Sequence, residues 1–165
     1  MRDFALSYCF FESPVGNLLL AGDHEAIHYL SFPIGSKSFD PKPDWMQNDS
    51  CFAGVKEQLF QYFSGELETF DLSFKLHGTE FQKRVWTALL QIPYGETRTY
   101  GDIARELGDP KASQAVGSAN GSNPIPIIIP CHRVIGANGK LTGFGGGIET
   151  KQFLLNLESP MKLLI

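Results

Sequence analysis

Residues 130–134 read Pro-Cys-His-Arg-Val, which places a thiol beside an imidazole. A cysteine is a strong nucleophile only as its thiolate, so it needs a basic or cationic neighbour. His132 can serve Cys131 as that base, although adjacent side chains often point apart, so the proton can require a bridging water. A base works best when a third group orients it, and Glu158, at the end of the last predicted helix, is the candidate. This pattern indicates nucleophilic chemistry at Cys131.

The competing interpretation of Cys131 is a buried and inert side chain. Free cysteine often packs as a small hydrophobic residue, and Cys131 follows an isoleucine-rich run. We favour the functional interpretation because prolines bound the run and the polar pair His132-Arg133 follows it. An apolar run that carries an active cysteine to a surface makes more physical sense than one that buries an arginine.

A second chemical pattern is His-Glu-Ala-Ile-His at residues 24–28, which matches the His-Glu-x-x-His of zinc proteases. That motif works on a helix, where histidines four residues apart share a face. Here Gly22-Asp23 precedes it and β-branched and aromatic residues follow, which predicts a turn entering a strand. On a strand such histidines lie about 13 Å apart, too far to share a zinc ion. We therefore expect no metal site, and two histidines that are exposed or internally hydrogen-bonded.

The composition is that of a globular protein. The chain has 165 residues, 42% of them hydrophobic, which is enough for one large or two small units without disulfides or metals. No apolar run approaches the roughly 20 residues of a membrane helix, and residues 1–4 lack the apolar core of a signal peptide. Three cysteines cannot all pair. We expect a cytoplasmic protein with no membrane partner and no disulfide framework.

The charge is unevenly distributed. A net charge of −4 taken alone argues against nucleic acid as a partner. However, residues 1–76 hold 5 Lys/Arg and 11 Asp/Glu, whereas residues 77–165 hold 9 and 7. Of the 13 phenylalanines, 10 also precede residue 77. This shift predicts two units, 1–76 and 77–165, with any polyanion bound weakly and salt-sensitively by the second.

The first unit reads as a small sheet with one helix. Alternating and apolar runs predict strands over 5–11, 18–22 and 27–32, followed by a surface loop over 33–50. Helical spacing from Phe52 to Phe63 ends at Gly65, and residues 70–74 alternate like one more strand.

The second unit reads as mostly helical. Thr79-Glu80-Phe81-Gln82 is a capping box that opens a helix ending before Pro93. A short helix follows from Thr99 to Gly108, and Asp109-Pro110 opens another through about Ser118. Two short helices joined by a glycine turn fit either a helix-turn-helix or an ordinary helical hairpin, and the pattern alone leaves both open.

The end of the chain completes this unit. Residues 123–130 are apolar and punctuated by proline, which predicts a rigid extended element. A glycine-rich loop over 143–147 precedes a last helix over 148–158.

At these residues the chain resembles the methylated-DNA–protein-cysteine methyltransferases, or O6-alkylguanine-DNA alkyltransferases. Residues 130–135, Pro-Cys-His-Arg-Val-Ile, match the active-site signature of that family. Other family positions follow in family order: Phe81-Gln82, Val85-Trp86, Ile92-Pro93-Tyr94-Gly95-Glu96-Thr97, Tyr100, Ile103-Ala104, Ala115-Val116-Gly117, Asn123-Pro124, Gly146-Gly147, Lys151 and Leu154-Leu155. The resemblance is strong from about Thr79 to Glu158 and only topological before that.

The resemblance implies an α+β fold. A small ribonuclease-like sheet domain with a helix would serve as structural support. A mostly helical, winged-helix-like domain containing a helix-turn-helix would follow it.

The resemblance also implies a suicide DNA repair protein. Such a protein flips O6-alkylguanine out of duplex DNA, whose minor groove the helix-turn-helix contacts, and moves the alkyl group irreversibly to its own cysteine. We therefore expect a monomer that acts once and needs no cofactor or metal, with activity on O4-alkylthymine left open.

Carried over by position, the resemblance assigns roles to individual residues. Cys131 is the nucleophile, His132 takes its proton through a water, and Glu158 holds the histidine. Tyr100 helps to rotate the base and protonates or hydrogen-bonds it as it leaves, and Asn123 braces the helix-turn-helix against the active-site loop. The substrate- and DNA-binding positions are Ser113, Gln114, Ala115, Gly117, Pro126, Arg133, Val134 and Gly145.

Two positions depart from the family pattern. Gln114 stands where the family usually has an arginine finger, which predicts weaker DNA binding and slower flipping without loss of the chemistry. Phe144 stands where many members have tyrosine, which leaves open the preference between methyl and bulkier alkyl groups. A damage-binding protein without catalysis is the second interpretation, but such proteins lack the cysteine that is present here.

Overall fold

The computed structural model describes residues 5–159. Residues 1–4, on which the export expectation rests, and residues 160–165, the end of the second predicted unit, lie outside the described residues. Within the described part, no helix is long and apolar enough to cross a membrane.

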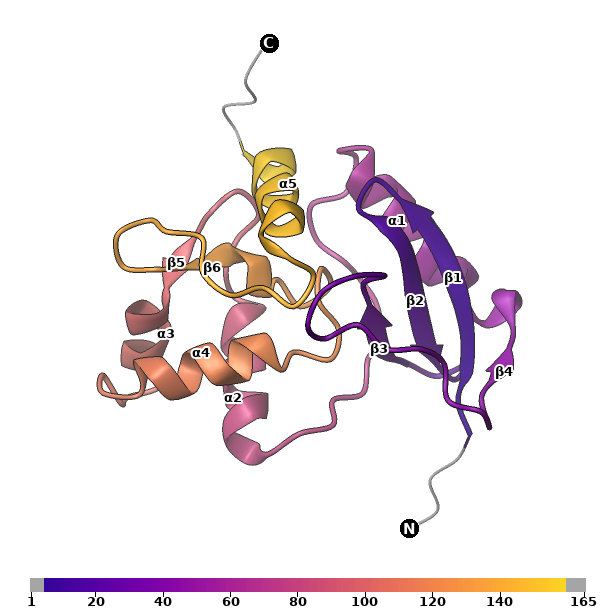
Figure 1. Ribbon diagram of the computed structural model, residues 1–165, viewed down its shortest axis with the longest axis horizontal. Coiled ribbons are helices and arrows are strands. Elements are labelled where there is room, and N and C mark those ends of the chain that lie inside the picture. The colour runs from indigo at the N-terminus through magenta and orange to yellow at the C-terminus, as the bar shows by residue number, and fades with distance from the viewer. Residues whose placement is uncertain (1–4, 160–165) are drawn as a thin grey trace.

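The amino-terminal half is built on a four-stranded sheet (Figure 1). Its strands are β1 (Ser7–Ser13), β2 (Gly16–Gly22), β3 (Ile27–Ser31) and β4 (Met46–Gln47), in the order β3-β2-β1-β4. The first three strands pair antiparallel, whereas β4 runs parallel to β1. The three long strands confirm the predicted ones, and β4 is a short addition inside the predicted loop over 33–50.

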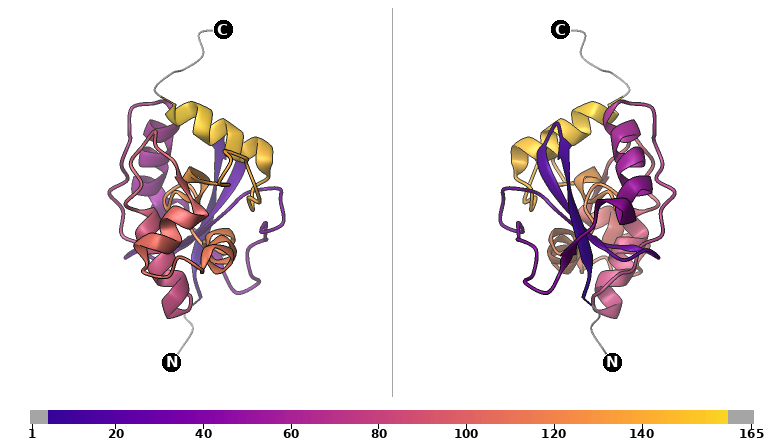
Figure 2. Two further views of the ribbon diagram at one scale, coloured as in Figure 1. Left: turned by 90° about the vertical axis from the view of Figure 1, so that its left-hand side faces the viewer. Right: turned by 90° about the vertical axis from the view of Figure 1, so that its right-hand side faces the viewer.

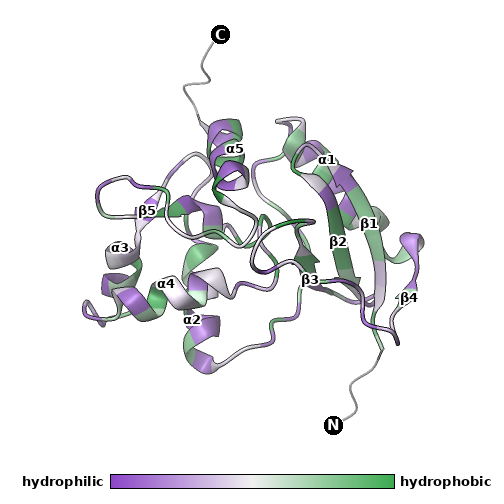
Figure 3. Cartoon of the chain, in the orientation of Figure 1, coloured by the Kyte–Doolittle hydropathy of each residue, from purple (hydrophilic) through white to green (hydrophobic). Residues whose placement is uncertain are grey.

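Strand β2 shows how the sequence distributes side chains between the two faces of the sheet. Leu18 and Leu20 enter the main core, whereas Leu19 and Ala21 pack under Trp45 on the opposite face. Successive side chains on a strand point to opposite faces, so this strand is buried on both sides. It is therefore hydrophobic along most of its length (Figure 3).

Helix α1 (Ala53–Phe63) packs on β1 and follows a single 3-10 turn over Asp49–Phe52. The predicted strand over 70–74 was wrong. In its place, the side-chain amide of Gln58 donates to the carbonyl of Asp71 and accepts from its N–H, so these groups have no strand partner. Only Phe74 forms an isolated bridge, with Ile27.

The carboxy-terminal half is mostly helical, as predicted. Its helices are α2 (Glu80–Leu89), α3 (Tyr100–Glu106), α4 (Ser113–Gly121) and α5 (Ile148–Glu158). Two short strands, β5 (Arg98–Thr99) and β6 (Val134–Ile135), pair parallel. Capping boxes at Thr79 and Thr99 open α2 and α3, because each hydroxyl accepts a backbone N–H that the first turn leaves unpaired.

Two local predictions in this half were wrong. Helix α4 begins at Ser113, not at Asp109-Pro110, because those residues form a turn in which the N–H of Ala112 donates to the carbonyl of Asp109. Residues 123–130 are not extended. The N–H of Ile129 donates to the carbonyl of Ile125, and Ile127 has a φ of 75°, so the run folds into a tight turn.

The two halves share one hydrophobic core, whose largest fully buried side chains include Phe52 and Tyr62 from the first half and Trp86 and Ile103 from the second. In Figure 1 the sheet lies on one side, α2, α3 and α4 lie on the other, and α5 lies between them at the top. The views in Figure 2 look along the line that joins the two halves, and in them the sheet and the helices lie one behind the other. This stacking brings segments of both halves to one cavity.

Candidate active site

Cys131 begins a 3-10 turn over Cys131–Arg133 and lines a cavity of about 310 Å³. The volume is at the lower end of the range for small-molecule sites. The lining comes from both halves: Tyr29, Leu30, Ser31, Phe32, Lys37 and Phe39 from the first, and His77, Asn120, Gly121, Ser122, Asn123, Pro124, Pro126, Cys131, Gly143, Phe144 and Gly145 from the second.

The turn that carries Cys131 is held by two asparagines from the end of α4 and the residues after it. Asn120 donates through Nδ2 to the carbonyl of Cys131 at 3.3 Å, and Asn123 donates to the carbonyl of Ile129 at 2.8 Å. These bonds couple the surface helix to the cysteine. The expected bracing role of Asn123 therefore has a geometric counterpart, and Asn120 shares it.

The Cys131 thiol is protonated at neutral pH. Its side chain is 4% exposed, and burial raises its pKa to about 11, against the opposing hydrogen bond from Asn123 and the charge of Lys151. A neutral thiol is a weak nucleophile, so the reaction needs a base that removes the proton as the sulfur attacks.

His132 has one ring nitrogen occupied and one available. Nε2 lies 2.7 Å from Oε2 of Glu158, a carboxylate oxygen that can only accept, so Nε2 carries the proton in the neutral ring. Nδ1 is then an acceptor, and among the described residues it has no hydrogen-bond partner. Burial lowers the pKa of His132 further than Glu158 raises it, so the ring is neutral and can take a proton.

Cys131 and His132 share no direct hydrogen bond among those that the described residues make. The expected transfer of the proton through a water stays a prediction. The available Nδ1 is the atom to which the thiol proton can go.

Glu158 is buried behind His132 and is ionised at neutral pH. It is 2% exposed, and burial alone would raise its pKa, but hydrogen bonds from His132 and Arg133 outweigh burial and hold the pKa at about 2. Arg133 donates to both oxygens, at 2.7 and 3.0 Å, and the hydroxyl of Tyr62 donates to Oε2 at 2.5 Å.

The expectation that the apolar run would not bury an arginine was wrong. Arg133 is 7% exposed, because Glu158 neutralises it and the carbonyl of Ile92 accepts a further bond at 2.7 Å. Its guanidinium also lies 5.8 Å from the ring centre of Tyr94. It does not line the cavity, so the structure places it with the carboxylate rather than with a substrate.

The structure brings together some of the predicted pocket residues and separates others. Pro126 and Gly145 line the cavity with Cys131 and Asn123, whereas Val134 is buried behind it and Tyr100 stands outside it. The hydroxyl of Tyr100 is 3.2 Å from Oγ1 of Thr142, the residue before the cavity-lining Gly143.

Lys151 is a part of the site that the residue assignments missed. It is fully buried, and Nζ donates to the carbonyls of Val134 at 2.6 Å and Thr142 at 3.1 Å, which ties α5 to both sides of the loop over 135–142. The sequence contained a signal for it. Lys151, Leu154 and Glu158 have the i, i+3, i+7 spacing of one helix face, so the lysine falls on the buried stripe of α5.

The exposed face of α4 carries the predicted DNA-binding positions. Gln114 and Ala115 are exposed, and Ser113 and Gly117 are half-buried. The opposite face is buried through Val116, Ala119 and Asn120. The helix therefore presents a surface of small side chains beside the cavity that its last turn lines.

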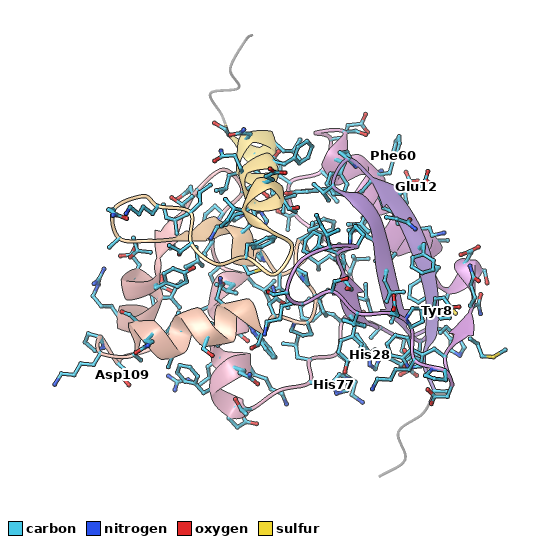
Figure 4. All side chains as sticks on the ribbon, in the orientation of Figure 1. Tyr8, Glu12, His28, Phe60, His77 and Asp109 are labelled. Carbon is cyan, nitrogen blue, oxygen red and sulfur yellow. The ribbon has the colours of Figure 1, made fainter. Side chains whose placement is uncertain are left out.

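The zinc-protease pattern at 24–28 lies on a turn and β3, as predicted. The His28 ring nitrogens lie 3.0 Å from Nε2 of His77 and 3.2 Å from Oδ2 of Asp23 (Figure 4). His24 lies apart from them, with Nδ1 3.9 Å from Sγ of Cys51. Among residues 5–159, no group of three or more His, Cys, Asp or Glu side chains could hold a metal ion.

Comparison with known proteins identifies the family. Residues 6–76 match the ribonuclease-like domain of 6-O-methylguanine DNA methyltransferase, and residues 80–160 match its DNA-binding domain. A methylated-DNA–protein-cysteine methyltransferase of Methanosarcina acetivorans is 57% identical over 92% of this chain and 97% of its own. One of Mycolicibacterium paratuberculosis is 51% identical over 97% and 98%.

A solved structure agrees with these relatives. The crystal structure of Mycobacterium tuberculosis OGT in complex with DNA superposes with a TM-score of 0.87 at 51% identity, over 95% of this chain and 97% of that one. The chain therefore belongs to the 6-O-methylguanine DNA methyltransferase family, whose members repair alkylated DNA by moving the alkyl group onto one of their own cysteines.

Proposed function

We propose that Cys131 accepts the alkyl group of an O6-alkylguanine that has been flipped out of duplex DNA, and that each molecule reacts once. The observation that carries this proposal is the pairing of a cavity-lining thiol with a histidine whose Nε2 is fixed by a buried carboxylate. The other cysteines are outside this arrangement: Cys9 lies on β1 with its side chain buried in the core, and Cys51 lies in the turn before α1.

The proposed step is a displacement at carbon. The Cys131 sulfur attacks the alkyl carbon as the bond from that carbon to O6 breaks, and the bonding electron pair leaves with the guanine. The thiol proton passes to Nδ1 of His132, through a water, and the departing guanine finally takes up one proton, so the charge balances. Glu158 stabilises the imidazolium while it exists. The product is a thioether, which nothing in the chain can cleave, so turnover ends there.

Tyr100 is proposed as the donor that hydrogen-bonds or protonates the base as it leaves. The support is its position at the rim, where its hydroxyl contacts Thr142 beside the cavity-lining Gly143. Pro126, Gly145 and the backbone at Val134 are proposed to hold the guanine.

Helix α4 is proposed to enter the minor groove. Its exposed small side chains permit a close approach of the helix to the DNA. Minor-groove contacts carry little sequence information, which suits a protein that must find lesions in any sequence. Gln114 would occupy the space that the flipped base leaves. Flipping costs a few kcal/mol and costs least for a weakly paired damaged base, which favours the lesion.

We further propose that the protein acts as a cytoplasmic monomer of two units, 1–76 and 77–165. The three cysteines are free thiols, as expected in a reducing compartment.

Intact-mass measurement after incubation with duplex DNA carrying O6-methylguanine tests the proposal. We expect a gain of one methylene that maps to Cys131, absent in Cys131→Ser and retained in the control Cys51→Ser. A lesion that binds without any mass gain would contradict alkyl transfer and would indicate a damage-recognition protein instead.

A further inference from the structure

Two buried polar atoms beside Cys131 lack a hydrogen-bond partner. Among the buried side-chain nitrogen and oxygen atoms of residues 5–159, only Oδ1 of Asn120 and Nδ1 of His132 are without one. Such atoms are rare in folded proteins, because leaving a buried polar atom unpaired costs free energy. Both belong to side chains that adjoin the nucleophile: His132 follows Cys131 in the chain, and Asn120 donates through Nδ2 to the Cys131 carbonyl at 3.3 Å.

The hydrogen bonds that these residues already make fix both atoms as acceptors. Nδ2 of Asn120 must face the Cys131 carbonyl, because the amide oxygen in that place would meet another acceptor. The other arm of the amide is therefore Oδ1. In His132 the ring proton is on Nε2, because Glu158 can only accept, so Nδ1 presents a lone pair. Two acceptors cannot bond each other, so together they require a donor with two hydrogens.

A water molecule meets this requirement. Asn120 and Cys131 line the same cavity of about 310 Å³, which has room for a water. Buried waters typically make about three hydrogen bonds to groups that are otherwise unpaired. Here the two acceptors would take the two hydrogens of the water, and its oxygen would accept from the Cys131 thiol. That thiol keeps its hydrogen at neutral pH, because burial raises its pKa to about 11.

We propose that Asn120 is a positioning residue for alkyl transfer, whose Oδ1 holds the water that carries the thiol proton of Cys131 to Nδ1 of His132. This role rests on the proposed function of Cys131. As Sγ attacks the alkyl carbon and the bond from that carbon to O6 breaks, the water oxygen takes the thiol proton and passes one of its own hydrogens to Nδ1. The water is restored, the imidazolium forms, and guanine leaves with the electron pair and later gains a proton.

The contact with Oδ1 fixes how the water is turned. With one hydrogen held by Asn120, the water directs its second hydrogen to His132 and a lone pair to the sulfur. A water without this contact can turn both hydrogens elsewhere, and the path for the proton is then broken. A purely structural role for Asn120 would use only Nδ2, which braces the cysteine turn.

A crystal structure of the full chain that shows ordered waters tests the contact directly. We expect one water within hydrogen-bond distance of Asn120 Oδ1, His132 Nδ1 and Cys131 Sγ. A structure in which no water contacts both Oδ1 and Nδ1 would overturn the proposal. This test needs no variant, so it decides the question even if a substitution of Asn120 prevents folding.

Single-turnover kinetics test the role in transfer. The rate of mass gain at Cys131 with saturating duplex DNA carrying O6-methylguanine is measured for wild type and Asn120→Leu, from about pH 7 to about pH 9.5. Leucine has a similar volume and no polar atom. We expect transfer to be about tenfold slower in the variant at pH 7, as for the loss of one hydrogen bond. The difference should shrink as the pH rises toward the thiol pKa of about 11, because a thiolate needs no proton path.

Ala119→Gly is the matched control. Ala119 precedes Asn120 in the last turn of α4 and is also 3% exposed. Glycine destabilises a helix and changes no side-chain hydrogen bond, so any effect on the rate should be the same at every pH. Lys37 and His77, which line the cavity, and Lys151, whose charge acts on the thiol, are unchanged in both variants.

The outcomes are distinguishable. If the wild-type protein gains no methyl group, the proposed function fails, and the role of Asn120 fails with it. If the wild type gains methyl but Asn120→Leu reacts at the same rate, or is slower by the same factor at every pH, the role of Asn120 is overturned while the proposed function stands.

Discussion

At the scale of single residues, the site separates the roles of three neighbours. Cys131 lines the cavity, His132 is buried behind it, and Arg133 turns to the far side to neutralise Glu158. Burial raises the pKa of the thiol and lowers the pKa of the histidine, so both are neutral at rest. The resting site therefore holds no thiolate–imidazolium pair.

The first prediction concerns the pH dependence of transfer. His132 has a pKa below its ordinary 6.5 because it is buried, so it stays available as a base below that pH. The single-turnover rate with O6-methylguanine DNA, measured from about pH 8 to about pH 5, should be flat through pH 6.5 and fall only below it. A midpoint at or above pH 6.5 would contradict a neutral, buried base.

The second prediction concerns stability in acid. Glu158 has a pKa of about 2 in the folded protein against an ordinary 4.5, so its contribution is complete above pH 4.5 and is lost as the pH falls toward 2. The shift corresponds to about 3 kcal/mol of the free energy of unfolding. Urea unfolding of wild type and Glu158→Gln across this window checks it.

Glu158→Gln should be less stable at neutral pH, because Arg133 loses its counter-ion, but it should lose less stability between pH 4.5 and 2. Equal acid-induced losses in the two proteins would mean that other carboxylates dominate.

At the scale of elements, α4 connects the DNA-binding surface to the cysteine turn. Its outer face carries polar or small side chains, and its inner face is buried. In its last turn, Asn120 donates a hydrogen bond to the carbonyl of Cys131. These contacts join the face of α4 that is proposed to meet DNA to the turn that carries Cys131.

The third prediction concerns the exposed residue of its first turn. Gln114→Arg should tighten binding to duplex DNA and increase the slope of log affinity against log salt by about one, because one more phosphate or base contact is charged. Gln152→Arg on α5 adds the same charge away from α4 and should have a smaller effect. DNA affinity at fixed salt that is unchanged by Gln114→Arg would refute the inference that glutamine weakens binding.

At the scale of the whole molecule, the amino-terminal half is part of the active site as well as its support. It contributes the Tyr62 hydroxyl that hydrogen-bonds Glu158, and it contributes Tyr29 and Phe32 to the cavity that Cys131 lines. The backbone also joins the halves, because the N–H of Leu30 donates to the carbonyl of Pro124.

The fourth prediction tests this coupling through Tyr62. Tyr62→Phe removes a buried hydrogen bond to a charged group, which should lower the free energy of unfolding by about 1.5 to 3 kcal/mol. Urea unfolding of both proteins measures this difference. Unfolding should remain a single transition in both, because one core spans the halves. Two separate transitions in the wild-type protein would contradict a shared core.

Much of the secondary structure was predictable because its signals are local. The capping boxes at Thr79 and Thr99 and the spacing of α5 depend on residues within one or two turns of each other. The errors arose where a distant or unexpected partner decided the conformation. Gln58 takes the backbone hydrogen bonds of Asp71 that a strand over 70–74 would have used, and Asn123 helps to fold the proline-punctuated run into a turn.

The active site also divides into features that local sequence signals and features that distant partners decide. The sequence by itself indicated Cys131 and His132 as the candidate nucleophile and base, because they are adjacent and their chemistry follows from residue type, and it indicated Glu158 from its place at a helix end. Only the tertiary structure decided that Arg133 neutralises Glu158, that Lys151 and Tyr62 join the site, and that Tyr29, Phe32 and Phe39 line one cavity with Cys131. Burial, charge neutralisation and cavity shape depend on residues nearly 100 positions apart, and no local pattern encodes which of them will meet.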